Sequence, residues 1–163
     1  MGNVNPALIA TQLGEFTAQY TKQGLARLQF PCTKFDPVAN PIKPTTRLLD
    51  LSAKAIDAAI NGTTPRTLPP LDLSSATDFQ RTVWALLQSI QVGQLETYGK
   101  LAYRLNNPKA TRAVGGACGA NPIPILIPCH RVVGANGSLT GFSAGINWKV
   151  RLLRIEGVEL PLH

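Results

Sequence analysis

Residues 97–118 read TYGKLAYRLNNPKATRAVGGAC, and this stretch decides how the second half of the chain folds. Thr97 can cap a short helix, because its side chain can accept a hydrogen bond from the first helical turn. After a polar turn, Asn107 can cap a second helix over residues 109–118, and Pro108 suits the first turn of that helix. Two short helices joined by a tight turn predict a helix-turn-helix, whose second helix usually enters a groove of DNA.

The second of these helices carries small residues where a base-reading helix would carry Asn, Gln or several Arg. It contains Arg112, Ala113, Gly115, Gly116 and Ala117. Two adjacent glycines cost about 1 kcal/mol each relative to alanine, so a close approach of another molecule should compensate. A slim helix fits a minor groove, and Arg112 is a candidate to push into the base stack. The alternative is that Gly115 and Gly116 allow close packing of helices within the protein.

Hydrophobic spacing and capping signals predict the remaining elements. Alternating apolar residues around a polar turn predict a β-hairpin over residues 14–30, and helical spacing predicts an amphipathic helix over 48–60. The proline-rich residues 63–72 cannot continue that helix and predict a linker between two lobes. Thr77 and Gln80 form a capping box, which predicts that a further helix begins there.

The chain has 163 residues and a net charge of +7, which is distributed unevenly. Residues 1–75 hold seven Lys and Arg against five Asp and Glu, whereas residues 76–163 hold nine against four. The excess is therefore +2 in the first half and +5 in the second. This difference predicts a surface for a polyanion in the second half, with scattered solubilising charge as the alternative.

Composition also sets the class of protein that we expect. The apolar content of 44% is ordinary for a globular domain, and no apolar run approaches the roughly 20 residues that a membrane helix needs. The N-terminus lacks the pattern of a secretory signal, and the three cysteines have uneven spacing that does not suggest a disulfide framework. We therefore expect an intracellular protein in a reducing compartment.

A second motif follows the helix-turn-helix, since residues 121–133 read NPIPILIPCHRVV. This extended, proline-stiffened run would fix the position of Cys129 and His130 at its end. Apolar surroundings raise the pKa of a thiol, so a reactive Cys129 needs a base or a positive charge, which His130 or Arg131 could supply. Adjacent helical residues do not face each other, so His130 should reach the thiol through a water or a second group. The alternative is a buried thiol with a purely structural role.

Together with residues 97–117 and the run from Lys149 to Gly157, this motif resembles the O6-alkylguanine-DNA alkyltransferases. The resemblance covers about residues 77–157, whereas residues 1–75 match only in layout. It implies an α/β N-terminal lobe with a ribonuclease-H-like fold over residues 1–75. It also implies a mainly α C-terminal lobe over residues 76–163, with a winged-helix-like helix-turn-helix.

The activity that the resemblance implies is direct-reversal repair of DNA damage. Such a suicide enzyme flips O6-alkylguanine out of duplex DNA, with O4-alkylthymine as a second candidate lesion. It transfers the alkyl group irreversibly to its own cysteine, once per molecule and without a cofactor. In this chain the implied acceptor is Cys129, and His130, through a water, forms with Glu156 the relay that generates the thiolate. Tyr98 would help to rotate the nucleotide and donate to guanine N3, and Asn121 would tie the DNA-facing elements to the active-site turn.

The resemblance also implies a DNA-binding surface and a substrate pocket. The DNA-binding residues would be Thr97, Tyr98, Arg112, Ala113, Gly115, Gly116 and Ala117, with Arg112 filling the vacated stack. The pocket residues would be Val132, Phe142, Ser143 and Lys149. The backbone N–H of Ser143 would face guanine O6, and the carbonyl groups of Cys129 and Val132 would hold the exocyclic amine. Ala144 stands where the family pattern has glycine, so the pocket width departs from that pattern.

The implied partner is double-stranded DNA, bound in the minor groove by a monomer, with cooperative binding along DNA as a further option. The implied location is the cytoplasm, in association with the nucleoid, or the nucleus. No membrane contact is expected, and no metal, because Cys32 and His163 have no ligand spacing. Three other classes compete with this hypothesis: a non-enzymatic lesion sensor, a sequence-specific regulator and a thiol hydrolase. The presence of Cys129, the lack of base-reading side chains and the lack of an oxyanion-hole signature argue against them in turn.

Overall fold

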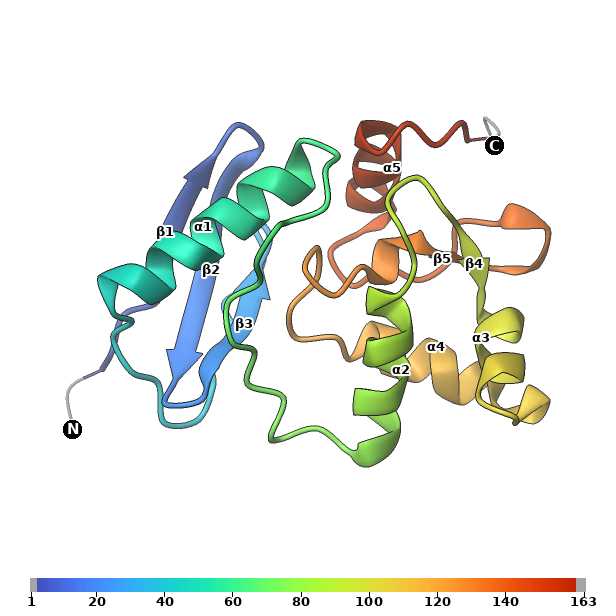
Figure 1. Ribbon diagram of the computed structural model, residues 1–163, viewed down its shortest axis with the longest axis horizontal. Helices are drawn as coiled ribbons and strands as arrows, with labels where there is room; N and C mark the ends of the chain where they lie inside the picture. The colour runs from blue at the N-terminus through green and yellow to red at the C-terminus, as the bar shows by residue number, and fades with distance from the viewer. Residues whose placement is uncertain (1–2, 161–163) are drawn as a thin grey trace.

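Three antiparallel strands and one helix form the N-terminal lobe of the computed structural model, which describes residues 3–160 (Figure 1). The elements are β1 (Ala7–Thr11), β2 (Gly14–Thr21), β3 (Gly24–Gln29) and α1 (Thr46–Ile60). The sheet has the order β1-β2-β3, and a register shift interrupts the β2–β3 pairing between Gln19 and Tyr20. The predicted hairpin is therefore confirmed, but it is extended by a strand, β1, that the sequence pattern did not predict.

Helix α1 covers one face of this sheet (Figure 1). The side chain of Thr45 caps it by accepting a hydrogen bond from the backbone N–H of Leu48, at 3.2 Å. Its apolar side buries Ala55, Ile56 and Ile60 in the core. The predicted helix over residues 48–60 is confirmed, and its packing gives the lobe an α/β architecture.

The predicted linker is fixed to the sheet. The backbone N–H of Leu25 donates to the carbonyl of Pro70, and the N–H of Asp72 donates to the carbonyl of Leu25, both at 2.8 Å. Gly24 is needed for this approach, because its φ is +140° and a Cβ there would lie 2.2 Å from the Pro70 oxygen. The segment between the lobes is thus an additional edge of the N-terminal lobe.

The C-terminal lobe is mainly helical. Its elements are α2 (Asp78–Gln88), β4 (Glu96–Thr97), α3 (Tyr98–Arg104), the 3₁₀ turn η1 (Pro108–Ala110), α4 (Thr111–Gly119), η2 (Cys129–Arg131), β5 (Val132–Val133), η3 (Ala135–Gly137) and α5 (Ile146–Ile155). Thr77 and Gln80 form the predicted capping box on α2, and Thr97 caps α3 through the backbone N–H of Lys100 at 3.1 Å. Helices α3 and α4 form the predicted helix-turn-helix.

One capping prediction is wrong. The side chain of Asn107 makes no capping hydrogen bond to the described part of the chain. Residues after it first form the 3₁₀ turn η1, and α4 begins only at Thr111. Pro108 occupies the first position of that turn, where its missing N–H is not required.

Two contacts hold the site-bearing elements together within this lobe. The indole N–H of Trp84 on α2 donates to the carbonyl of Ala117 on α4, at 2.8 Å. Strands β4 and β5 pair in parallel, with Glu96 opposite Val132. These contacts place the start of α3, the helix α4 and the turn η2 beside one another.

The two lobes share one hydrophobic core. The backbone N–H of Leu28 on β3 donates to the carbonyl of Pro122 at 2.9 Å, and Phe30 stacks near Trp148 of α5 with ring centroids 4.8 Å apart. Over residues 3–160, none of the helices combines the length and the apolar character that crossing a membrane takes. The division at residue 75, the ribonuclease-H-like description and the winged-helix-like description stay predictions.

Candidate active site

Cys129 is the first residue of the 3₁₀ turn η2 and is buried, with 7% of its surface exposed. Its backbone N–H donates to the carbonyl of Ile127 at 2.8 Å, so the proline-stiffened run leads directly into the turn. Burial raises the pKa of the thiol, while the Asn121 side chain and the positive charge of Lys149 act in the opposite direction. The thiol is therefore protonated at rest, and its reaction needs a base.

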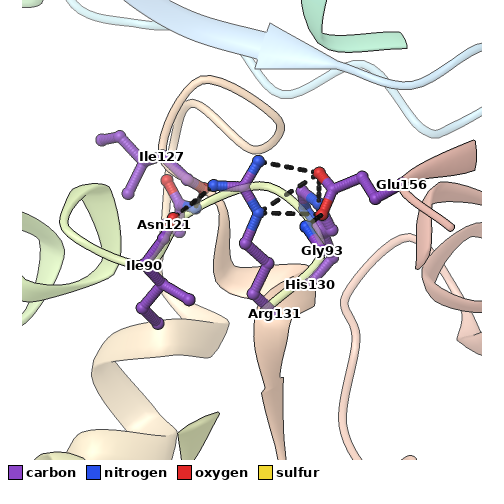
Figure 2. A network of polar contacts seen from close by, with 7 residues as sticks. All are labelled: Ile90, Gly93, Asn121, Ile127, His130, Arg131 and Glu156. Atoms are coloured by element: carbon purple, nitrogen blue, oxygen red, sulfur yellow. Dashed lines mark hydrogen bonds and ion pairs between the residues drawn. The ribbon is translucent and has the colours of Figure 1, made fainter. Parts of the chain in front are cut away.

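A buried polar network joins His130 and Arg131, the two residues after Cys129, to Glu156 (Figure 2). His130 Nε2 lies 2.8 Å from Glu156 Oε1, and the Nε of Arg131 lies 3.2 and 3.0 Å from the two oxygens of the same carboxylate. Arg131 Nη2 adds a contact of 2.8 Å with Oε1, and Nη1 donates to the carbonyl of Ile90 at 2.5 Å. The N–H of Gly93 donates to Oε2 at 3.4 Å. One carboxylate, 3% exposed, thus accepts hydrogen bonds from two segments, the turn η2 and the loop at Gly93.

The charge states in this network follow from its geometry. Burial alone would raise the pKa of Glu156, but the hydrogen bonds from His130 and Arg131 bring it down to about 2. Burial lowers the pKa of His130; Glu156 raises it again, and Arg131 and Lys149 lower it. At neutral pH, Glu156 is therefore ionised and His130 is neutral. A neutral His130 that donates from Nε2 to Glu156 carries its free lone pair on Nδ1.

That lone pair is available to accept a proton. His130 Nδ1 is buried and has no hydrogen-bond partner within residues 3–160. Likewise, no hydrogen bond joins the Cys129 sulfur to His130 in the described part of the chain. The two residues are neighbours in one turn, but a proton would need an intermediate group to pass between them.

Asn121 fixes the loop that precedes the turn. Its Nδ2 donates to the carbonyl of Ile127 at 2.7 Å, and its Oδ1 accepts from the N–H of Ile123 at 3.0 Å. Asn121 is itself buried at the end of the segment that leaves α4. It therefore ties the helix-turn-helix to the turn that bears Cys129.

A hollow of about 510 Å³ opens at Tyr98, which lies close enough to Cys129 to interact with it electrostatically, and its volume is within the roughly 300–1,000 Å³ that is usual for small-ligand sites. Its lining consists of Tyr98, Gly115, Gly119, Thr140, Gly141, Phe142 and Ser143. Phe142 and Ser143, two of the predicted pocket residues, belong to this lining, and their contact with a substrate stays a prediction. Val132 and Lys149 are buried and do not belong to the described lining.

Lys149 and Tyr98 meet at the edge of this hollow. Tyr98 Oη donates to the carbonyl of Thr140 at 3.1 Å, and Lys149 Nζ donates to the same oxygen at 3.3 Å. The ammonium group lies 5.9 Å from the centre of the Tyr98 ring. Burial raises the pKa of Tyr98 to about 12, with the nearby Cys118 and Cys129 adding to the effect. Tyr98 is therefore a hydrogen-bond donor at neutral pH and not a base.

Helix α4 exposes a slim surface next to the hollow. Arg112, Ala113 and Gly116 are exposed, and a Cβ added at Gly116 would meet no described heavy atom within 4 Å. Close packing within the protein therefore does not explain Gly116. Ala117 differs from these residues, because it is 3% exposed and its carbonyl accepts a hydrogen bond from Trp84 of α2; its contact with DNA stays a prediction.

The structure gives no support for a metal site. Within residues 3–160, no group of three His, Cys, Asp or Glu side chains could hold an ion. Cys32 is exposed in a turn with a φ of +61°. Cys118 is buried and packs in the core. His163 lies outside the described residues.

Comparisons with known proteins agree on one family. The family profile described as "6-O-methylguanine DNA methyltransferase, DNA binding domain" matches residues 78–158. The crystal structure of Mycobacterium tuberculosis O6-methylguanine methyltransferase has a TM-score of 0.79 and 34% identity, covering 98% of this chain and 96% of that chain. The chain belongs to the O6-methylguanine DNA methyltransferase family. Another structure, M. tuberculosis OGT in complex with DNA, has a TM-score of 0.80 over the same shares of both chains.

Sequence similarity to curated methyltransferases extends over about half of this chain. A methylated-DNA–protein-cysteine methyltransferase of Haemophilus influenzae is 55% identical over 82 residues, which make up 50% of this chain and 46% of that protein. The chain spans about half the length of the curated relatives that it matches. The structural similarity therefore covers nearly the whole chain, whereas the family profile covers residues 78–158.

The methyltransferase site contains two groups that sequence reasoning did not assign. The sequence indicates Arg131 as a source of a base or a positive charge for the thiol. In the structure its guanidinium binds the carboxylate of Glu156 instead. A charged residue within a buried apolar run needs a buried counter-charge, and this rule could have linked Arg131 to Glu156. The carbonyl of Thr140, which Tyr98 and Lys149 share, had no signal in the sequence.

Proposed function

We propose that this chain is a methylated-DNA–protein-cysteine S-methyltransferase, which repairs O6-alkylguanine by moving the alkyl group to Cys129. The observation that carries the proposal is the buried thiol next to a neutral His130, whose Nε2 is held by an ionised Glu156. Family membership supports the same activity. The proposal extends to O4-alkylthymine as a second substrate.

The chemistry would begin with a proton transfer. The S–H proton of Cys129 passes to a water, and that water gives a proton to Nδ1 of His130, which leaves a thiolate and an imidazolium next to Glu156. The sulfur then attacks the saturated alkyl carbon, so a C–S bond forms as the C–O6 bond breaks. The electron pair of the broken bond goes to guanine, whose developing charge a hydrogen bond from Tyr98 stabilises. The thioether has no easy return path, so each molecule acts once.

The lesion would have to leave the duplex to reach Cys129, because the thiol is buried and the target carbon is shielded by stacking. The slim, exposed side of α4 supports an approach to the minor groove, with Arg112 entering the vacated stack. The related M. tuberculosis structure contains DNA, which supports duplex DNA as the partner. Binding as a monomer, with cooperativity along DNA as a variant, completes the proposal.

Intact-protein mass spectrometry tests the activity. The chain is mixed with a duplex that contains one O6-methylguanine, and the product is then mapped by peptide. We expect a gain of one methyl group per molecule on Cys129 and no gain in Cys129→Ser. Binding of the lesion without a change in mass would replace the proposal with a non-enzymatic sensor.

The role of Arg112 can be separated from the chemistry with two substrates. Arg112→Ala should slow repair in duplex DNA by about tenfold or more, because an unfilled base stack costs a few kcal/mol. Reaction with free O6-benzylguanine, which needs no flipping, should stay within about twofold of the unaltered protein. An equal loss of rate on both substrates would show that Arg112 has no specific role in base flipping.

A further inference from the structure

Four aromatic rings connect the N-terminal lobe to the segment that forms the hollow. Phe30 follows directly after β3 and is 4% exposed. Its ring lies 5.7 Å from that of Phe142 in an edge-to-face arrangement and 4.8 Å from that of Trp148. Phe16 on β2 lies behind it, with centroid distances of 5.5 Å to Phe30 and 6.1 Å to Trp148. Phe142 is thus a lining residue of the hollow that also contacts the N-terminal lobe.

The backbone of segment 140–143 forms hydrogen bonds within its own loop, since the N–H of Gly145 donates to the carbonyl of Phe142 at 2.8 Å, and two contacts tie the segment to other parts of the molecule. At one point, the carbonyl of Thr140 accepts hydrogen bonds from Tyr98 and Lys149, both in the C-terminal lobe. At the other point, the ring of Phe142 contacts Phe30. Between these points lies Gly141, which has a φ of +64° and contributes no side chain to hold the segment. The place of Phe142 therefore depends on Phe30.

Phe30 is itself well fixed. The hydrogen bond from Leu28 to the carbonyl of Pro122 holds the end of β3 against the C-terminal lobe. The segment after Phe30 is confined as well, because Pro31 packs closely against the backbone of Gly14. A Cβ added at Gly14 would lie only 2.9 Å from the ring of Pro31. A rigid ring behind a lining residue sets how far that residue can retreat from the hollow.

We infer that Phe30 is a positioning residue of the N-terminal lobe that fixes Phe142 as a wall of the hollow and so limits the size of the alkyl group accepted. This inference rests on the proposed function. It gives the N-terminal lobe a part in substrate selection, although the family profile matches only residues 78–158. Removing the ring of Phe30 leaves space behind Phe142, into which Phe142 can move and widen the hollow.

The experiment compares two duplexes that differ only in carrying O6-methylguanine or O6-benzylguanine. The rate of alkyl transfer is measured on both with the unaltered protein, Phe30→Ala and Phe16→Ala. The ratio of the benzyl rate to the methyl rate should rise by at least about fivefold in Phe30→Ala, as expected for a pocket with added apolar space. Phe16→Ala is the matched control, because it removes a ring from the same cluster that lies next to Phe30 and Trp148. Its ratio should stay within about twofold of the unaltered protein.

The ratio separates a role in selection from a loss of stability, since partial unfolding lowers both rates by the same factor. An unchanged or lower ratio in Phe30→Ala, or an equal rise in Phe16→Ala, overturns the inference and leaves the proposed function intact. If the unaltered protein transfers neither group, the proposed function is wrong, and the inference is wrong with it. Phe30→Leu, which preserves most of the buried volume, should shift the ratio in the same direction by less, and it replaces Phe30→Ala if that variant does not fold.

Discussion

Arg131 controls the charge of the site although it does not contact the thiol. Its guanidinium binds both oxygens of Glu156 and the carbonyl of Ile90, so its position is fixed from two sides. Its positive charge helps to keep Glu156 ionised and opposes a proton on His130. The residue thereby preserves a neutral His130 that can accept the thiol proton.

Replacing Arg131 should change the pH dependence of the reaction. In Arg131→Met the positive charge that repels a protonated His130 is lost. The pKa of His130 should therefore be higher in this variant than in the unaltered protein. Because only neutral His130 can act as the base, the acid limb of the rate profile should move to higher pH. The measurement is the rate of transfer from O6-benzylguanine between pH 5 and 9.

Arg131→Lys is the control, since it retains the charge while losing the two-pronged contact. Its acid limb should stay close to that of the unaltered protein even if its rate is lower. Removing one partner of a buried pair costs about 3–5 kcal/mol, so the rates must be taken well below the melting temperature of each variant. A limb that does not move in Arg131→Met would mean that Glu156 alone sets the charge state of His130.

At the scale of elements, helix α4 has a glycine that packing within the described residues does not explain. Gly116 is exposed, has helical geometry and has open space where a Cβ would lie. Gly116→Ala should therefore stabilise the fold by up to about 1 kcal/mol, as measured by denaturant unfolding.

If the slim side of α4 enters DNA, Gly116→Leu should weaken duplex binding by about tenfold, the effect of a loss near 1.4 kcal/mol.

The matched control for this helix is Ala85→Leu, which adds a large side chain at an exposed position of α2. It should leave duplex binding unchanged, and neither leucine variant should alter the reaction with free O6-benzylguanine by more than about twofold. Normal duplex binding by Gly116→Leu would show that α4 does not face DNA.

Elements with local signals could be predicted from the sequence. The capping box at Thr77 and the cap at Thr97 are side chain to backbone contacts within one turn, so the sequence contains both partners. Strand β1 could not be predicted, because its sequence ALIAT does not alternate and its pairing partner is another segment. The prediction at Asn107 was wrong, because the residues after this favourable capping residue form a 3₁₀ turn and not the first turn of the helix.

Across the whole molecule, the site depends on contacts between residues that lie far apart in the chain. The motif around Cys129 identified the thiol and His130 as candidates, because both lie in one short segment. The contact of Phe30 with Phe142 joins residues in different lobes, and no local pattern contains it. The same holds for the convergence of Ile90, Arg131 and Glu156, which the fold alone produces.

This convergence also links the site to the stability of the whole chain in acid. The pKa of Glu156 is about 2 in the folded protein, against an ordinary value of 4.5. A carboxylate whose pKa is lowered by folding stabilises the protein above pH 4.5, and this contribution is lost as the pH falls from about 4.5 to 2. At about 1.4 kcal/mol per pKa unit, the loss is roughly 3 kcal/mol. His130 also destabilises the folded protein in acid, but at higher pH. Its pKa is lowered by folding, so as the pH falls through 6.5 the histidine binds a proton in the unfolded chain before it does so in the folded one.

Glu156→Gln should therefore lower the free energy of unfolding at pH 7 and also flatten its decline below pH 4.5. The amide cannot titrate, so the part of the acid loss that belongs to Glu156 disappears. The measurement is urea unfolding at intervals between pH 7 and pH 3. Asp50→Asn serves as the control, because that carboxylate is exposed on α1 and pairs only with Lys54 one turn away. It should show the same decline as the unaltered protein, and a parallel decline in Glu156→Gln would mean that the buried network does not set the acid stability of this fold.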